Sequence, residues 1–155
     1  MGISIDEDVY GWSQEQASLL RDAARTGRHA GLDFETLAEQ IEDMGRTQKQ
    51  GVRYALTRVV EHLLYLQYVN RREGRVVWKE TVLLGRYHAR DILDDNPPLR
   101  DTFDLEEIYR RGRTLAELHF QHAGLDSRVL PEECPYDLAH LLDEGWWPKN
   151  KFGWA

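Results

Sequence analysis

The sequence predicts an all-α protein, an antiparallel bundle of about five main helices followed by a short C-terminal helix. Apolar residues recur at steps of three and four through most of the 155-residue chain, which is the period of one helix face. Glycines and prolines separate these segments, and no segment alternates apolar and polar residues as a half-buried strand does. Helices joined by short connectors bury their apolar stripes against one another, so a bundle is expected.

The first two helices are predicted from their end signals. Ser13 and Gln16 have the spacing of a capping box, so the first helix is expected to begin near Ser13 and to stop at Gly27. Asp33 is a good N-cap for the second helix, whose apolar residues run to Gly45. Gly45 either ends this helix or lies inside a longer one, and the polar residues 46–51 lead into the next pattern.

The strongest helical pattern covers residues 52–70. A fourth stripe runs over residues 78–92 and is stopped by Pro97 and Pro98, because proline lacks the amide hydrogen that a helix needs. Asp104 opens a fifth helix that ends at Gly124, and a short helix is expected over residues 136–143. Gly85 and Gly112 lie within apolar stripes, where they would permit a close helix crossing.

Length and composition predict one domain over residues 1–155. The net charge of -7 disfavours nucleic acid as a partner of the whole surface. A single cysteine, Cys134, excludes an internal disulfide framework and a four-cysteine zinc site. No apolar run reaches the roughly 18 residues that a bilayer crossing needs, and the acidic N-terminus lacks the features of a signal peptide. We therefore expect a cytoplasmic protein that does not bind a membrane.

Five stretches together resemble the domain of unknown function 29 family, and they cover nearly the whole chain. They are residues 8–10 with Trp12, the segments LAEQIEDMGR (37–46) and HLLYLQY (62–68), Trp78, and LPEECPYDLAHLLDEGWWP (130–148). The resemblance implies an all-helical protein of bacterial or cyanobacterial type, in a family without an assigned activity. His88 and His119 depart from what the family leads us to expect, so a site built from them would be particular to this chain.

One group of residues has the composition of a metal site. It joins carboxylates of the second helix to imidazoles of the next three: Glu39, Glu42, His62, His88 and His119. Helical bundles hold zinc, iron or manganese with such side chains. The simpler interpretation is a solvated acidic face and boundary histidines, and the two Glu-x-x-His repeats of di-iron bundles are absent.

A second group combines arginine, lysine and tryptophan at the turn before the fourth helix. Its members are Arg71, Arg72, Arg75, Trp78 and Lys79. Arginine can clamp phosphate and tryptophan can stack on a base, so an RNA or other anion contact is one hypothesis. The alternative is that Trp78 packs inward while the arginines form ion pairs.

Cys134 and His140 have the residue types of a nucleophilic pair, but no third group is indicated, and Cys134 is interpreted as a small packing residue. In the aromatic C-terminus, Trp146 and Trp147 are expected to fold back onto the bundle. Phe152 and Trp154 are candidates for contact with a partner chain.

The residues favour a non-enzymatic interaction or accessory protein that binds a protein partner or a second copy of itself. A metal-binding bundle with hydrolase or oxidase activity is the first alternative. An RNA-contacting protein is the second. The sequence leaves open whether the protein is an enzyme and which cofactor, if any, it holds.

Overall fold

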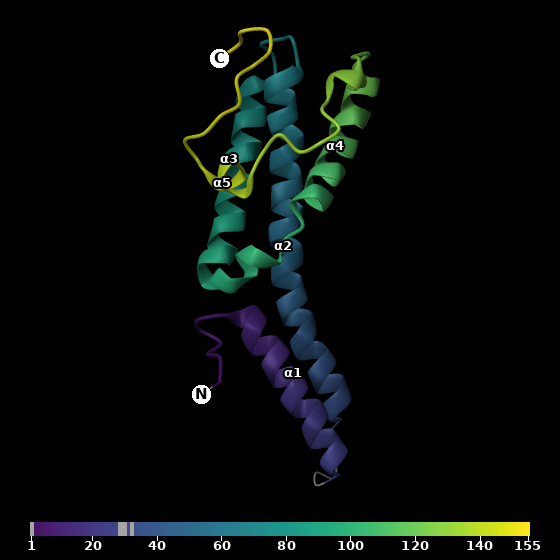
Figure 1. The fold of residues 1–155 in the computed structure, drawn as a ribbon, viewed down its shortest axis with the longest axis vertical. Helices are drawn as coiled ribbons and strands as arrows, with labels where there is room; N and C mark the ends of the chain where they lie inside the picture. The colour runs from purple at the N-terminus through teal and green to yellow at the C-terminus, as the bar shows by residue number, and fades with distance from the viewer. Residues whose placement is uncertain (1, 28–30, 32) are drawn as a thin grey trace. The chain divides into compact units, whose positions relative to one another are not determined.

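The computed structural model describes residues 2–27, 31 and 33–155, and over these residues it contains helices and no strand (Figure 1). The elements are α1 (Val9–Thr26), α2 (Phe34–Tyr68), α3 (Arg75–Asp95), the 3-10 helix η1 (Pro97–Thr102), α4 (Leu105–His122), the 3-10 helix η2 (Ser127–Val129) and α5 (Leu138–Leu142). The predicted all-α class is confirmed. None of the described helices combines the length and the apolar character that a membrane crossing requires.

The chain forms two compact units. The first unit comprises Met1–Val52 and Asp91–Phe103, and the second comprises Arg53–Arg90 and Asp104–Ala155. Helices α2 and α3 each contribute one part to each unit. The single domain expected from the length of the chain stays a prediction. Unfolding experiments can test it, because one domain should unfold in a single transition.

Helix α1 begins four residues earlier than its sequence pattern indicated. Asp8 is the N-cap, and its carboxylate accepts a hydrogen bond from the backbone N–H of Gly11 at 2.8 Å. Ser13 is therefore not a cap. It is fully buried inside the helix, and its hydroxyl donates to the Tyr10 carbonyl at 2.7 Å. The predicted stop is confirmed, because Gly27 adopts the left-handed conformation, with φ of 63°, that ends many helices.

Helix α2 is one continuous helix of 35 residues where two helices were expected. Gly45 lies inside it and lacks the positive φ of a helix stop. The residues that follow, 46–50, are arginine, threonine, glutamine and lysine, most of which are good helix formers, and no proline interrupts them. Of the two alternatives for Gly45, the structure shows the second: Gly45 lies inside a longer helix. Ala38 and Val52 are fully buried in the first unit.

The core of the second unit forms where α3 and α4 cross the C-terminal part of α2. A β-carbon on Gly85 would lie 2.7 Å from Val59 Cγ2, and one on Gly112 would lie 2.6 Å from Val60 Cγ1. Only glycine permits so close an approach, which confirms the predicted crossings. Asp104 caps α4 as expected, since its carboxylate accepts from the backbone N–H groups of Glu106 and Glu107.

The segment after α4 belongs to this core and is not a loose tail. Its buried residues are Leu130, Tyr136, Leu141 and Leu142. The short helix α5 begins at Leu138, and its cap Asp137 forms a capping box with His140. Arg86 of α3 fastens it, because its Nε and Nη2 donate to the carbonyls of Leu141 and His140 at 3.2 and 2.9 Å. Trp146 and Trp147 fold back as expected, Trp146 against Tyr136 and Trp147 against Arg86.

Candidate functional site

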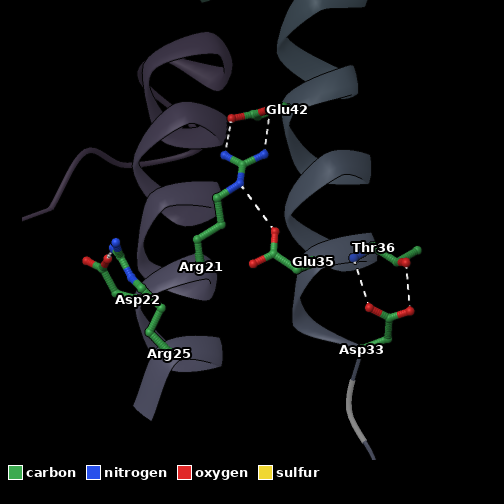
Figure 2. A network of polar contacts seen from close by, with 7 residues as sticks. All are labelled: Arg21, Asp22, Arg25, Asp33, Glu35, Thr36 and Glu42. Carbon is green, nitrogen blue, oxygen red and sulfur yellow. Dashed lines mark hydrogen bonds and ion pairs between the residues drawn. The ribbon is translucent and has the colours of Figure 1, made fainter. Parts of the chain in front are cut away.

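Both glutamates of the predicted metal set lie on α2 in the first unit, and Figure 2 shows Glu42 paired with Arg21 of α1. The Arg21 guanidinium donates to both carboxylate oxygens of Glu42 and lies 3.7 Å from Glu35. Its hydrogen bond lowers the pKa of Glu42, so this carboxylate is charged and already paired. Glu39 is exposed and contributes a favourable charge interaction with Arg21.

Two of the three histidines in that set come together in the second unit. The rings of His62 and His119 lie against the ring of Tyr65, with centroids 5.0 and 4.4 Å away. The Tyr65 hydroxyl donates to Glu61 Oε1 at 2.6 Å, and His62 Nδ1 lies 2.9 Å from the Arg58 carbonyl. His119 Nε2 is buried and has no hydrogen-bond partner among the residues that the structure describes.

Burial lowers the pKa of both histidines, so they are neutral at pH 7. His88, the remaining residue of the set, is exposed on α3 and lines a different surface, described below. In the described part of the chain, no group of three or more histidine, cysteine, aspartate or glutamate side chains is placed to hold a metal ion. The metal set therefore stays a prediction from sequence, tested by elemental analysis of untagged protein.

The residues predicted to contact RNA, within positions 71–79, are partly buried and partly exposed. Trp78 is only 6% exposed and packs against Tyr65, with Arg71 over its ring. It has no free face for a base, because it continues the buried stripe of α3. Arg75 is also 6% exposed. Arg71 and Arg72 remain on the surface, and Lys79 is half-buried.

Neither Cys134 nor His140 is prepared for nucleophilic chemistry. The Cys134 thiol donates to the Tyr136 carbonyl at 3.2 Å, and burial raises its pKa, which disfavours the reactive thiolate. His140 is engaged in the cap of α5, where the backbone N–H of Asp137 donates to its Nδ1. The interpretation of Cys134 as a packing residue agrees with these contacts.

The two residues proposed for partner contact lie on a fixed C-terminal segment. Trp154 Nε1 donates to Asn70 Oδ1 at 3.0 Å, which ties the segment to the end of α2. Phe152 and Trp154 are still 54% and 40% exposed. Both therefore remain accessible.

The sequence did not predict one apolar feature of the surface, a groove between α2 and α3 in the second unit, which we call the α2–α3 groove. Its volume is about 270 Å³. It is lined by Tyr54, Ala55 and Arg58 from α2 and by Thr81, Leu84, Gly85 and His88 from α3. Tyr54 and Leu84 are 69% and 67% exposed. Because Gly85 has no side chain, backbone forms part of the floor.

The sequence carried one signal for this groove. Tyr54 and Leu84 are large apolar residues that lie off the buried stripes of their helices, where polar side chains are usual. Nothing in the sequence indicated that they would face the same groove, since 30 positions separate them. Only the crossing at Gly85 brings them to one surface.

Two comparisons with known proteins found similarity, one to a family model and one to a crystal structure. The family model described as "Domain of unknown function DUF29" matches residues 5–147, so the chain belongs to this family. The resemblance found in the sequence is confirmed. A crystal structure of an alpha-helical protein of unknown function from Rhodospirillum rubrum ATCC 11170 is similar, with a TM-score of 0.81 and 26% sequence identity. The similarity covers 94% of this chain and 92% of that one. No curated protein matches the chain.

Proposed function

We propose that this protein is a non-enzymatic interaction protein that binds an amphipathic helix of another protein in the α2–α3 groove. The observation that carries the proposal is the exposure of Tyr54 and Leu84, at 69% and 67%, in one groove. Large apolar side chains at such exposure in a concave surface are typical of interaction sites, and aromatic residues are frequent anchors.

The shape of the groove favours a helix as the occupant. On α3 its lining residues stand at positions 81, 84, 85 and 88, the spacing of one helix face, and α2 supplies the facing residues 54, 55 and 58. A third helix can pack between two such helices as it does in a bundle, with its apolar residues directed into the groove. The close crossing of α2 and α3 at Gly85 keeps the two walls of the groove near each other, so side chains of the partner would contact both helices.

The charge of the groove lining indicates which residues should flank the apolar stripe of the partner helix. Arg58 is the charged side chain in the groove, His88 is the titratable one, and no carboxylate lines it. Arg58 is 37% exposed, and its ion pair with Glu61 leaves part of the guanidinium towards solvent. We therefore expect acidic residues beside the apolar stripe of the partner helix.

A photo-reactive phenylalanine analogue at position 84 tests this proposal. We expect irradiation in the native cell to join position 84 to another protein, at an amphipathic helix with acidic flanks. A second substitution, Tyr54→Glu, should remove the adduct. The same analogue at position 118, which is exposed on α4, is the control.

Three results would overturn the proposal. They are adducts of equal yield at positions 84 and 118, an adduct made of two copies of this chain, and the absence of any adduct at position 84. Light scattering of the purified protein separates the second result from the others.

The proposal includes a cytoplasmic location and excludes nucleic acid and membrane as main partners. The net charge of -7 and the burial of Trp78 support the exclusion of nucleic acid.

A further inference from the structure

The second unit contains a second cavity, the C-terminal cavity, with a volume of about 220 Å³. It lies away from the α2–α3 groove and shares no lining residue with it. Its lining consists of Leu66, Arg75, Lys79, Trp147, Pro148, Lys149, Asn150, Trp154 and Ala155. Three cations and two tryptophans therefore meet in one cavity, and no carboxylate side chain lines it, in a chain whose net charge is -7.

Arg75 is the buried cation of this cavity. Its Nη1 donates to the Leu66 carbonyl at 3.0 Å and its Nε to the Ala155 oxygen at 2.8 Å. Its Nη2 makes a longer contact of 3.5 Å with the Trp154 carbonyl. Among the described residues, no carboxylate side chain forms an ion pair with Arg75, Lys79 or Lys149. Arg75 therefore already has oxygen partners for its three nitrogens, one of them on the last residue, Ala155, and Lys79 and Lys149 are the cations of the cavity that a bound anion would meet.

The aromatic walls are held in place before any ligand arrives. Lys79 lies over the ring of Trp147 at 5.7 Å, and Arg86 lies 4.9 Å from the same ring. Asn150 donates to the carbonyls of Leu66 and Val69 and accepts from the backbone N–H groups of Phe152 and Trp154. These bonds fix the segment that carries Trp154, so little ordering is needed on binding.

We propose that the C-terminal cavity binds a small organic anion that carries a phosphate or carboxylate group on a planar ring. The anionic group lies with Lys79 and Lys149, in the electrostatic field of Arg75, and the ring lies against Trp147 and Trp154. Lysine and arginine side chains recognise phosphate and carboxylate through charge-assisted hydrogen bonds. Aromatic walls add contact area for a flat group. The volume is below the several hundred Å³ typical of sites for drug-sized ligands, so one ring with one anionic group is the size that fits.

Calorimetric titration of the purified protein with phenyl phosphate, benzoate and inorganic phosphate at constant ionic strength tests the proposal. We expect saturable binding of one phenyl phosphate or one benzoate per chain. Inorganic phosphate should bind at least tenfold more weakly, because it lacks the ring. The phenyl phosphate and benzoate arms show which anionic group is preferred.

Matched lysine variants distinguish the cavity from the rest of the surface. The double variant Lys79→Gln/Lys149→Gln should weaken phenyl phosphate binding at least tenfold. The control Lys151→Gln should leave it unchanged, because Lys151 lies over Tyr68 and does not line the cavity. Lys79 is half-buried and Lys149 is exposed, so the double variant is expected to fold, which circular dichroism verifies.

The proposal fails if neither ring compound saturates, or if inorganic phosphate binds as tightly as phenyl phosphate. It also fails if Lys151→Gln weakens binding as much as the double variant does. These outcomes are independent of the α2–α3 groove, so either proposal can fail without the other.

Discussion

His119 and His62 show how burial decides the chemistry of a side chain. Both rings lie against Tyr65, and Glu61 is held by the Tyr65 hydroxyl. Burial disfavours the protonated imidazole, which lowers the pKa of both histidines below 6.5. The hydrogen bond between His62 and the Arg58 carbonyl opposes the shift of the His62 pKa, and the charge of Glu61 opposes the shift of both pKa values. The charges of Arg58 and Arg71 lower the pKa of His62 and of His119, respectively. The cluster is therefore a neutral packing element at pH 7.

These shifts predict an acid-sensitive fold. Above pH 6.5 both histidines are neutral in the folded and the unfolded chain, and they do not change stability. As the pH falls below 6.5, the unfolded chain takes up protons that the folded chain refuses, so the free energy of unfolding falls. The loss continues until the pH reaches the lower pKa of the folded state.

The variant His119→Phe should flatten this dependence, because it keeps a ring against Tyr65 and removes one titrating group. The slope below pH 6.5 should decrease by at most about 1.4 kcal/mol per pH unit, the linkage value for one proton. Urea unfolding at a series of pH values measures it. Leu118→Phe, at an exposed position of the same helix, is the control. An unchanged slope in His119→Phe would show that His119 does not contribute.

Helix α5 has only five residues, too few to be stable by itself, so contacts from α3 must hold it. Arg86 provides them through two hydrogen bonds to the carbonyls of the last turn of α5. Burial lowers the pKa of Arg86 to about 10, so it remains charged at neutral pH. Arg90, one turn further along α3, instead forms an exposed ion pair with Glu144 at 2.9 Å.

Arg86 and Arg90 should therefore differ sharply in their effect on stability when each is replaced by methionine. Arg86→Met should lower the free energy of unfolding by about 2–4 kcal/mol, because it removes charge-assisted hydrogen bonds and leaves buried carbonyls unpaired. Arg90→Met should cost less than about 1 kcal/mol, as exposed ion pairs do. Thermal or urea unfolding gives both values. Equal effects would mean that Arg86 does not anchor α5.

The C-terminal segment completes the second unit as a whole. Leu130, Leu141 and Leu142 are at most 7% exposed, and burial of three leucines contributes about 5–9 kcal/mol. That amount is comparable with the total stability of many domains. A chain truncated after Val129 should therefore lose cooperative unfolding and near-ultraviolet circular dichroism. A chain truncated after Lys151 loses hydrogen bonds to Arg75 and Asn70 but none of the buried leucines, and it should keep both. Cooperative unfolding of the shorter chain would contradict this role.

Much of the fold was readable from local patterns. The stop at Gly27, the caps Asp33 and Asp104, and the close crossings at Gly85 and Gly112 all agree with the structure. The predicted start of α1 was wrong, because Asp8 caps the helix and Ser13 is buried inside it. The candidate sites were less predictable. Trp78 and Arg75 looked available and are buried, while Tyr54 and Leu84 were not singled out and are exposed.

Local patterns in the chain were enough to predict the helical class, most helix ends and the family, because the helical period and the end-capping side chains act over a few neighbouring residues. The packing of the helices decides which polar side chains near a stripe are buried, and it forms both cavities. The C-terminal cavity joins Leu66 to Ala155, and the α2–α3 groove joins Tyr54 to His88. Such meetings depend on how helices pack, and helix periodicity contains no information about which partner a given face will meet.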